Sequence, residues 1–574
     1  MNIVSASSPE EVGNVSDAFV QTLWALGVRE AFGVLGGAIA PFCDAVNRTP
    51  IHFLHFRHEG GAAFAAVEAS LASGRPTVVF LTSGPGMTNA VTGMFAARWE
   101  GARVLFVSGT TGSAARGRWA FQETSGYTTP LSGLFTAGSM FHLAAMVESA
   151  AELETIGTRL SAGFTRPGGF VAHIGMPISL QTTPAGTPME GGPRSLVRGR
   201  VVTEKDVVAS CAELLASAPF TLWLGHGARH ASAEVRELVR RTHARVMCSP
   251  RGKGIVAEND PHFLGVTGLG GHEAVEEYLR TARPARTLVL GTRLGEFTSF
   301  YREDLVPREG FIHVDVDREV FGAAYPSAKT MGIESDVGAF VEGLLDAWPA
   351  AAPPMRPAIA AVAAREPTVL RDQAALVRPR VLMETLQRVV VEGTDAPVIS
   401  EAGNSFVLAT HHLRFTAPDR YRVSTGFGSM GHAVAGVIGM ALARHGKAVA
   451  IAGDGAMLMN HEISTAVSYG VPAVWVVLND ARYGMIDAGM RSLGWKPFGT
   501  DIPRADFVAI ARAVGADGVR VEREAELEAA LLAAMAAEGP FVVDVWIDPH
   551  EAPPANRRNT SLRRQVQAND TRVR

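Results

Sequence analysis

Short apolar runs that favour β-strands alternate with alanine-rich helical stretches along most of this 574-residue sequence, and this alternation limits the possible folds more than any other feature. In the first third, helical stretches around Glu59–Ser73 and Met94–Ala97 separate the runs VREAFGVLG, PTVVFLTSG and RVLFVSG. Strands that alternate with helices form βαβ units, whose strands pair in parallel and are covered by helices on both faces. The sequence therefore predicts an α/β protein built on doubly wound parallel sheets.

The alternation is interrupted at two places and so predicts three domains, within the roughly three to four expected for this length. A stretch rich in proline and glycine separates the first predicted domain, 1–182, from a central domain at 200–348. An alanine- and proline-rich linker at 349–377 leads to a third domain at 378–549. The remaining tail, 550–574, carries several arginines, and we expect it to be solvated or packed on a neighbouring molecule.

Composition and charge exclude several classes of function. The formal net charge of −4 and the absence of a basic stripe disfavour nucleic-acid binding, so the expected partners are small molecules or other copies of the chain. The three cysteines lie far apart, which fits a reducing cytoplasm better than a disulfide framework or a thiolate metal site. No export signal and no run of eighteen apolar residues is present, so we expect a cytoplasmic protein without a membrane span.

The most informative motif is Gly453-Asp454-Gly455, which follows one predicted strand, while the next strand ends in Asn479-Asp480. Parallel neighbouring strands end at the same edge of a sheet, which is where open α/β sheets bind ligands. Magnesium prefers oxygen ligands shared with phosphates, and glycines let the backbone approach a diphosphate closely. The motif alone is often only a turn, but its position predicts a site for a magnesium-bound diphosphate.

The spacing resembles the signature of thiamine-diphosphate-dependent enzymes, in which Gly-Asp-Gly is followed about two dozen residues later by Asn-Asn. Two other segments match independently: Arg57-His58-Glu59 with the later Ser83-Gly84-Pro85-Gly86, and STGFGSMGHAVAG at 424–436. Over nearly its whole length the chain is similar to the acetolactate synthase (acetohydroxyacid synthase) family. The resemblance implies a pyrimidine-binding, a central and a diphosphate-binding domain.

The resemblance also implies thiamine diphosphate and Mg²⁺ as cofactors. Asp454 and Asp480 correspond to side-chain ligands of the metal, and Arg482 to a ligand through its backbone carbonyl. Asp480 departs from the family's second Asn; it keeps an oxygen ligand but adds negative charge near the diphosphate. The other residues that the resemblance assigns to the cofactor are Gly36, Ser83, Gly84, Pro85, Asn89, Asn404, Ser405, Gly428, Met430, Gly453, Gly455, Ala456, Tyr483, Gly484 and Met485.

Four residues correspond to catalytic positions of the family. Taken alone, a first-turn Glu is usually solvated and a Met between glycines usually fills a core. By resemblance, Glu59 exchanges a proton with the aminopyrimidine ring, Met430 bends the coenzyme and the Gly428 carbonyl accepts from its amino group, while the cofactor carries the hard chemistry. Gln122 corresponds to a residue near the reacting centre. In this family the coenzyme lies between two subunits, which implies a homodimer or homotetramer.

Ala120-Phe121-Gln122-Glu123 resembles acetolactate synthases, whereas the His-His pair of simple pyruvate decarboxylases is absent from this region. Three substrate-pocket positions depart from that family: Phe297 replaces an Arg, Gly489 a Trp and Ile178 a Lys. These changes predict a larger and less cationic acceptor site, lined also by Phe121. The expected activity is a carboligase that decarboxylates a short 2-oxo acid, with pyruvate as the expected donor, and transfers the acyl-anion equivalent to an aldehyde, ketone, sugar ketone or activated acyl acceptor.

Several alternatives stay open at this point. A plain 2-oxo-acid decarboxylase or a 2-hydroxyacyl-CoA lyase would share the coenzyme site. A catalytically silent coenzyme-binding subunit is disfavoured by the intact Glu59. Arg293 and Asp315-Val316-Asp317 match flavin-contacting segments but also occur in relatives whose central domain is empty or binds ADP, so FAD is possible but not favoured. A nicotinamide-dependent dehydrogenase is disfavoured because no Gly-x-Gly-x-x-Gly follows the first strand.

Overall fold

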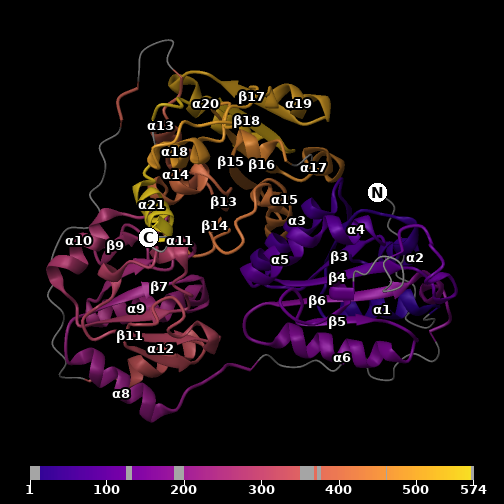
Figure 1. Ribbon diagram of the computed structural model, residues 1–574, viewed down its shortest axis with the longest axis horizontal. Coiled ribbons are helices and arrows are strands. Elements are labelled where there is room, and N and C mark those ends of the chain that lie inside the picture. Colours follow the sequence, from indigo (N-terminus) through magenta and orange to yellow (C-terminus); the bar gives the residue numbers. More distant parts are fainter. Residues whose placement is uncertain are drawn as a thin grey trace. The chain divides into compact units, whose positions relative to one another are not determined.

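The computed structural model of the protein describes residues 13–123, 132–185, 199–349, 368–370, 376–459, 462–551 and 553–570. The chain divides into two compact units, one within Met1–Gly199 and Leu442–Arg444, the other within the rest of the chain. The described residues form three six-stranded sheets, each made of parallel strand pairs and flanked by helices (Figure 1). This architecture confirms the predicted α/β fold with three doubly wound parallel sheets.

The first unit contains one sheet with the strand order β2-β1-β3-β4-β6-β5. Its strands are β1 (Glu30–Gly33), β2 (His52–His55), β3 (Thr77–Leu81), β4 (Arg103–Thr110), β5 (Leu143–Met146) and β6 (Phe170–Pro177). Its helices are α1 (Val15–Ala25), α2 (Ala40–Asn47), α3 (Glu59–Ser73), α4 (Pro85–Asn89), α5 (Val91–Glu100), α6 (Glu152–Thr165) and α7 (Ile178–Gln181). The inner strands read as continuous apolar runs because helices cover both faces of the sheet.

The second unit contains the other two sheets. The central sheet has the order β12-β11-β10-β7-β8-β9. Its strands are β7 (Phe220–Leu224), β8 (Arg245–Cys248), β9 (Phe263–Val266), β10 (Arg286–Leu290), β11 (Phe311–Asp315) and β12 (Thr330–Glu334). Its helices are α8 (Lys205–Ala216), α9 (Ser232–Thr242), α10 (Glu273–Ala282), α11 (Glu296–Ser299) and α12 (Val337–Asp346).

The third sheet has the order β14-β13-β15-β16-β18-β17, which repeats the connections of the first sheet strand for strand. Its strands are β13 (Val398–Ser400), β14 (Tyr421–Val423), β15 (Ala448–Gly453), β16 (Ala473–Asn479), β17 (Asp517–Val521) and β18 (Phe541–Trp546). Its helices are α13 (Pro379–Leu386), α14 (Asn404–His412), α15 (His432–Arg444), α16 (Asp454–Met457), α17 (Ile463–Tyr469), α18 (Gly484–Ser492), α19 (Phe507–Ala513) and α20 (Leu527–Ala536). A last helix, α21 (Asn556–Asp570), follows the sheet.

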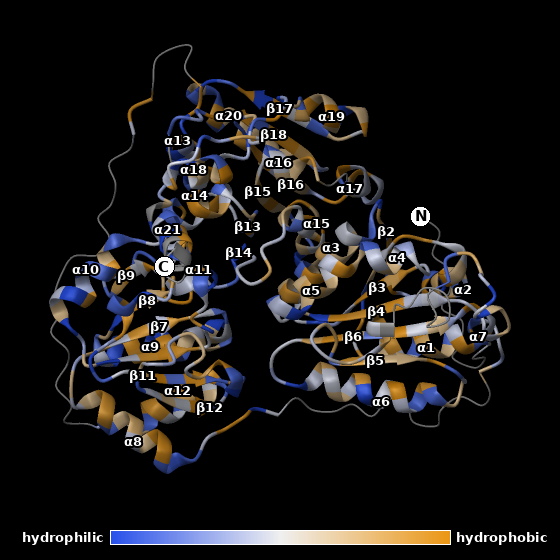
Figure 2. Ribbon diagram, in the orientation of Figure 1, coloured by the Kyte–Doolittle hydropathy of each residue, from blue (hydrophilic) through white to orange (hydrophobic). Residues whose placement is uncertain are grey.

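The cores of the three sheets are apolar, as the orange strands in Figure 2 show. In the third sheet, β15 and β16 are buried along their lengths and pair in parallel. Their register sets Gly453 opposite Leu478, so Asp454 and the Asn479-Asp480 pair follow at the same edge. The predicted meeting of these two strand ends is therefore present.

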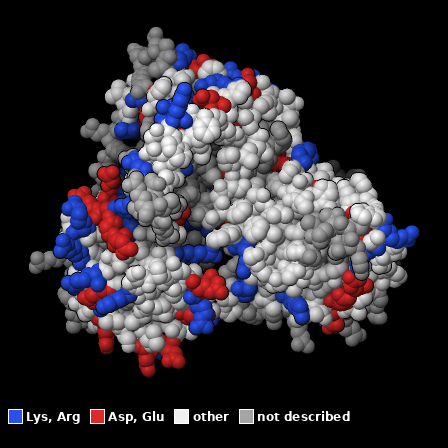
Figure 3. Space-filling model, viewed as in Figure 1, with Lys and Arg blue, Asp and Glu red and all other residues white. Residues whose placement is uncertain are grey.

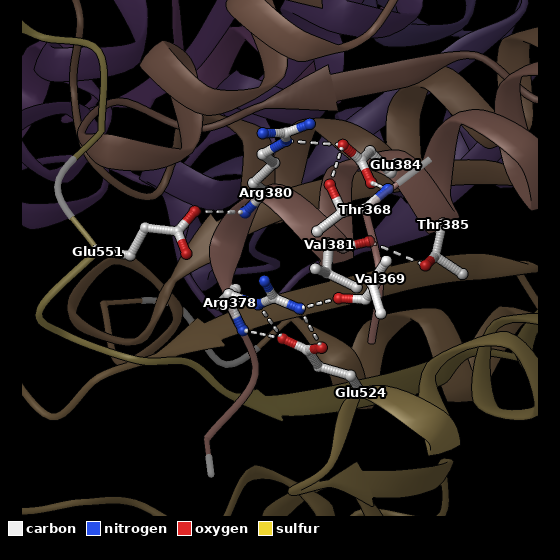
Figure 4. Close-up of polar contacts among 9 residues, drawn as sticks. All are labelled: Thr368, Val369, Arg378, Arg380, Val381, Glu384, Thr385, Glu524 and Glu551. Carbon is white, nitrogen blue, oxygen red and sulfur yellow. Dashed lines mark hydrogen bonds and ion pairs between the residues drawn. The ribbon is translucent and has the colours of Figure 1, made fainter. Parts of the chain in front are cut away.

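A buried ion pair fixes the start of the third sheet's domain. The Arg378 guanidinium, at the N-terminus of α13, donates from Nε (2.6 Å) and Nη2 (2.7 Å) to the two carboxylate oxygens of Glu524 (Figure 4). The Glu524 side chain is 1% exposed, and such two-point Arg–carboxylate contacts are geometrically specific. Residues 350–367 and 371–375 of the predicted linker, and 186–198 of the first interruption, lie outside the described residues. The predicted domain limits stay predictions.

Helix α21 packs on the protein's own second unit, whereas the sequence led us to expect a solvated tail or one packed on a neighbour. Figure 1 shows it between the central and third sheets. Arg557 forms an ion pair with Glu276 of α10 (2.6 Å), and Gln565 donates to Glu296 of α11 (2.8 Å). Acidic side chains of the central domain thus bind this cationic helix. The arginines at 572 and 574 lie outside the described residues.

Charged side chains of both signs are interspersed over the central-sheet region of the face shown in Figure 3. This distribution agrees with the small net charge of −4. None of the helices in the described part of the chain is both long and apolar enough to cross a membrane.

Candidate active site

The candidate cofactor and catalytic residues fall into two groups, one in each compact unit. Each group lies at the carboxyl ends of the parallel strands of its sheet. Because the first and third sheets share one connection pattern, the two groups occupy corresponding loops: those after β1 to β4 in one unit and those after β13 to β16 in the other. Ligands of open α/β sheets bind at this edge.

Glu59 is the centre of the group in the first unit. It begins α3, where His58 is the N-cap and accepts a hydrogen bond from the Gly60 backbone N–H. The Glu59 side chain is 7% exposed although it is ionisable. Asn89, at the end of α4, donates from Nδ2 to Glu59 Oε2 (3.0 Å), so one carboxylate oxygen is held in place. This contact joins two candidate residues that are thirty positions apart in the sequence.

The loops beside Glu59 admit little more than glycine. A Cβ added at Gly36 would lie 2.6 Å from Thr82, and one added at Gly86 would lie 2.9 Å from Thr82 and 3.4 Å from Glu59 Oε1. Gly84 has φ +58°, a left-handed conformation that strains side-chain-bearing residues. It leads directly into Pro85 at the start of α4, and the neighbouring Ser83 is buried. The glycines therefore let Thr82 and Gln122 pack closely on the backbone beside the Glu59 carboxylate.

Three other candidates of the first unit lie nearer the surface. Gln122 is half-buried with a left-handed φ of +57°, and its Cβ faces Gly84, where an added Cβ would approach to 3.1 Å. Phe121 is 88% exposed and Ile178, the first residue of α7, is 40% exposed. An aromatic side chain so exposed has little apolar cover within its own unit.

Asp454 is the centre of the group in the second unit. It begins α16 and its side chain is 3% exposed. Oδ1 accepts from the Gly455 backbone N–H (2.7 Å), and Oδ2 accepts from the Ala481 backbone N–H across the neighbouring loop (2.7 Å). Burial raises the pKa of Asp454, and these backbone N–H groups oppose that shift. The carboxylate thus ties the loop after β15 to the loop after β16.

Asp480, Asn404 and Gly484 meet at one point beside Asp454. A Cβ added at Gly484 would lie 2.7 Å from Asn404 Nδ2 and 3.0 Å from Asp480 Oδ2. Within the described residues, the buried Asn404 Oδ1 has no hydrogen-bond partner. An unsatisfied buried amide oxygen is costly, so it indicates a missing partner at this point. A Cβ at Gly455 would lie 2.4 Å from the Tyr483 ring, which explains the second glycine of the motif.

The carboxylates of Asp454 and Asp480 repel each other. The pKa of Asp480 rises to about 7, first because the group is buried and second because the Asp454 charge is close. The positive charges of Arg482 and Arg504 act in the opposite direction on the Asp480 pKa. Two carboxylates at one sheet edge bind a divalent cation readily, because the cation removes their repulsion.

The remaining candidates of the second unit differ in which of their groups are available to contact a ligand. Gly428 has φ +64° and donates its backbone N–H to Ser424 Oγ (3.1 Å), and Met430 is 36% exposed just before α15. Ser405, by contrast, is buried and donates its hydroxyl to the Glu401 backbone carbonyl (2.8 Å). Its side chain thus stabilises the start of α14, and only its backbone is left for a ligand.

Two of the departures in the predicted acceptor site are now placed. The half-buried Phe297 packs edge-on against Phe406 of α14 (ring centroids 5.9 Å apart) and near Phe300 (6.3 Å). Gly489 is buried beneath α21: a Cβ there would lie 3.2 Å from Arg558 Nη1 and 3.5 Å from Leu562. Helix α21 therefore fills the space that this glycine leaves, which we had expected to be open.

The central domain has a cavity of about 380 Å³ lined by Arg293, Gly295, Tyr301, Ala323 and Ala324. Arg293 also acts on Asp315 at the end of β11, whose pKa burial raises to about 6. One residue of the predicted flavin-contacting set thus lines this cavity. Binding of FAD stays a prediction.

Two residues next to these groups were missed by the sequence interpretation. Arg504 donates to the Asn479 backbone carbonyl (2.6 Å), and Arg558 donates to the Met485 backbone carbonyl (3.3 Å). Neither belongs to a motif, and Arg558 is 73 positions from its acceptor in sequence. Only the three-dimensional structure brings them to the loop after β16.

Comparisons with known proteins agree with this geometry. The chain matches the models of the thiamine pyrophosphate enzyme N-terminal TPP-binding domain (residues 13–129), central domain (208–344) and C-terminal TPP-binding domain (401–545). It is 30% identical, over 93% of this chain and 98% of the relative, to the "Putative acetolactate synthase large subunit IlvB2" of Mycobacterium tuberculosis. It is 28% identical to the sulfoacetaldehyde acetyltransferase of Castellaniella defragrans, over 91% of this chain and 90% of that protein.

A solved structure has the same fold. It is the thiamine diphosphate-dependent 4-hydroxybenzoylformate decarboxylase of Rhodococcus jostii RHA1, with a TM-score of 0.80, 20% sequence identity, and coverage of 94% of this chain and 100% of that chain. The family models together span most of the described chain, and each candidate group lies within one of the two TPP-binding regions. The chain therefore belongs to the thiamine-diphosphate-dependent enzymes of the acetolactate synthase-like family.

Proposed function

We propose that this enzyme decarboxylates a short 2-oxo acid, with pyruvate as the expected donor, and transfers the acyl-anion equivalent to an acceptor other than a standard 2-oxo acid. The observation that carries the proposal is the placement of Phe297. Its ring is packed among Phe300 and Phe406, at a position where the family resemblance expects an Arg that grips the acceptor carboxylate. An aromatic side chain cannot replace the two-point contact of a guanidinium with a carboxylate.

The residues present fit thiamine diphosphate and Mg²⁺. Gly455 and Gly484 let Tyr483, Asn404 and Asp480 pack directly on the loop backbone. Asn404 Oδ1 lacks a partner among the described residues, and Asp454 and Asp480 supply hard oxygen donors. In the described part of the chain, no three His, Cys, Asp or Glu side chains gather at one point. The metal would therefore take its other ligands from the Arg482 backbone carbonyl, the diphosphate and water.

The other half of the site would hold the aminopyrimidine ring. When bound, the coenzyme supplies the nucleophilic carbon that accepts the acyl group. Glu59 would exchange a proton with the ring nitrogen, and Asn89 keeps the Glu59 carboxylate in one orientation through its 3.0 Å hydrogen bond. The Gly428 backbone carbonyl would accept from the ring amino group, and Met430 would support the bent coenzyme. Gln122 would lie beside the reacting carbon.

We further propose that the two halves come from two copies of the chain, as the family resemblance implies. Each half leaves large apolar side chains exposed. Leu35 (50%) and Phe121 (88%) are exposed in the first unit, and Phe427 (38%) and Met430 (36%) in the second. Exposed large apolar side chains in both halves favour an interface between copies. Sedimentation velocity of the holoenzyme should show a dimer or tetramer, and an active monomer would contradict this part of the proposal.

Product analysis tests the acceptor assignment. The holoenzyme is supplied with pyruvate alone and with pyruvate plus an aldehyde, a ketone, a sugar ketone or an activated acyl compound, and carbon dioxide and products are quantified. We expect the product of acyl transfer to the added acceptor to exceed acetolactate. The name of the acetyltransferase relative, which specifies sulfoacetaldehyde, supports including a sulfonated aldehyde as one acceptor or donor. Acetolactate as the main product in every mixture would refute the proposal.

The variant Phe297→Arg sharpens the test. It restores a cation where the family has one, and we expect the acetolactate share to rise by roughly tenfold, within the range for gaining a charged partner. Phe297→Gln is the matched control, because it also removes the ring from Phe300 and Phe406 but adds no charge. An equal rise in both variants would show that lost packing, rather than the charge, changes the product.

The same mixtures distinguish the alternatives. A plain decarboxylase would release free aldehyde whether or not an acceptor is present. A 2-hydroxyacyl-CoA lyase would cleave the carbon–carbon bond next to the thioester carbonyl of its substrate without needing pyruvate. A silent subunit would bind the coenzyme without turnover.

A further inference from the structure

We propose that Arg504 is the counter-charge that allows this chain to carry Asp480 in its coenzyme loop. The inference rests on the proposed function, because it assumes that the loop binds Mg²⁺ and a diphosphate. Asp480 gives the loop a second carboxylate beside Asp454, where a neutral amide would serve equally as an oxygen ligand. With an anionic diphosphate at the same edge, this extra negative charge needs a compensating cation.

Arg504 is held next to Asp480 by the residue that precedes Asp480 in the chain. Its Nη1 donates to the backbone carbonyl of Asn479 (2.6 Å) and lies 3.4 Å from Asn479 Oδ1. Asn479 is itself fully buried, and its Nδ2 donates to Asp544 Oδ1 (2.8 Å) and to the Ala505 backbone carbonyl (3.1 Å). The guanidinium is therefore anchored to a rigid strand end, one peptide bond from Asp480.

Trp546 also holds the Arg504 guanidinium, which lies over the face of its ring. The last residue of β18, it pairs with Asn479 across the sheet, and the Arg504 guanidinium lies 4.7 Å from the centre of its ring. Arg520 lies on the same ring at 4.9 Å. Stacking on an aromatic face orients a guanidinium without neutralising its charge.

The two arginines on Trp546 differ in their ionic partners. Arg520 forms an ion pair with Asp506 (2.5 Å) and lies near the buried Asp544 (3.8 Å). Arg504 forms no ion pair with any Asp or Glu in the described ranges, although its guanidinium is bound to the backbone carbonyl that precedes Asp480. Its charge is thus available to the carboxylate pair, and because it stays beyond contact distance it leaves their oxygens free for a metal.

Arg482, the other nearby cation, is less suited to this role. It follows Asp480 by two positions in the same loop, and its assigned contribution to the metal is its backbone carbonyl. Its Nε is buried without a hydrogen-bond partner in the described structure, so its side chain has no anchor comparable to Asn479 and Trp546. Arg504 is the cation near Asp480 whose position these contacts hold fixed.

A double-mutant cycle on coenzyme affinity tests the inference. The dissociation constant of thiamine diphosphate is measured by titration calorimetry of the apoprotein at a fixed, saturating Mg²⁺ concentration, for the unaltered chain, Arg504→Gln, Asp480→Asn and the double variant. We expect Arg504→Gln to weaken binding by roughly tenfold when Asp480 is present and by no more than about threefold in the Asp480→Asn background, since contacting or networked charges are coupled on this scale.

Arg520→Gln is the matched control, because it removes the same charge from the same Trp546 ring, where Asp506 already neutralises it. Arg504→Lys keeps the charge and guards against a folding defect, and it should retain most of the affinity. Equal weakening by Arg504→Gln in both backgrounds, or equal weakening by Lys and Gln, would show that Arg504 only caps the strand and would overturn the inference. Failure of the unaltered chain to bind the coenzyme would instead overturn the proposed function.

Discussion

Replacing Gly489 by Trp should detach helix α21 from α18. Acetolactate synthases carry a Trp at this position by resemblance, so the substitution looks conservative from sequence. In the structure, a Cβ alone would already lie 3.2 Å from Arg558 Nη1 and 3.5 Å from Leu562. Alanine requires only a small shift of the flexible Arg558 end, whereas an indole needs the volume that Leu562 and the helix backbone occupy.

The expected magnitude follows from overpacking and from the contacts that hold α21. Forcing a large side chain into a filled site costs about 1–3 kcal/mol. Detachment of α21 from α18 would remove this cost. Departure breaks the Arg557–Glu276 ion pair, whose side chains are 15% and 17% exposed, and the Arg558 hydrogen bond to Met485. A shift of ~2 kcal/mol in this equilibrium raises the detached population roughly thirtyfold.

Limited trypsin digestion measures that population, because α21 contains Arg557, Arg558, Arg563 and Arg564. Cleavage of a transiently opened segment tracks the open population when reclosing is fast. Mass spectrometry monitors the loss of the C-terminal peptide. We expect the cleavage rate to be roughly thirtyfold higher in Gly489→Trp than in the unaltered chain and nearly unchanged in Gly489→Ala. Ile486→Trp is the control, since Ile486 is 49% exposed on the same helix. Equal cleavage in Gly489→Trp and Ile486→Trp would refute this account of α21.

Three further predictions concern the coenzyme site and the first unit. Glu59→Gln should keep the fold and much of the coenzyme affinity while turnover falls by about 10²-fold or more, the scale of losing positioned proton transfer; turnover close to that of the unaltered enzyme would remove Glu59 from the mechanism. After exhaustive chelation and removal of the coenzyme, adding Mg²⁺ or thiamine diphosphate alone should restore no activity and adding both should restore it, because the Asp454 and Asp480 charges repel a diphosphate without the metal. His173 is fully buried and its pKa is lowered to about 4, chiefly by burial, from an ordinary 6.5. Below pH 6.5 the unfolded chain therefore binds a proton that the folded chain does not, so stability falls as the pH drops toward 4, by ~2 kcal/mol between about pH 7 and 5. Urea unfolding at pH 7 and pH 5 should show a smaller loss in His173→Gln than in the unaltered chain, and an equal loss would contradict this assignment.

The sequence alone determined the strand ends and the cofactor class. The motif around Asp454 and the pair Asn479-Asp480 are local signals, and parallel pairing places their strand ends at one edge regardless of further detail. Glu59 at the start of a helix could also be recognised, because it too lies in a short local motif. These features depend on short stretches of backbone, whose local structure is encoded by neighbouring residues.

Only the tertiary structure decided which side chains surround those strand ends. Arg504 reaches Asn479 from 25 positions away, Phe297 turns into an aromatic cluster with Phe406, and α21 covers Gly489 from the far end of the chain. No periodicity or motif encodes such contacts, because they depend on how separate elements pack. The electrostatics of Asp480 likewise follow from burial and from the distance to other charges, and both exist only once the chain has folded.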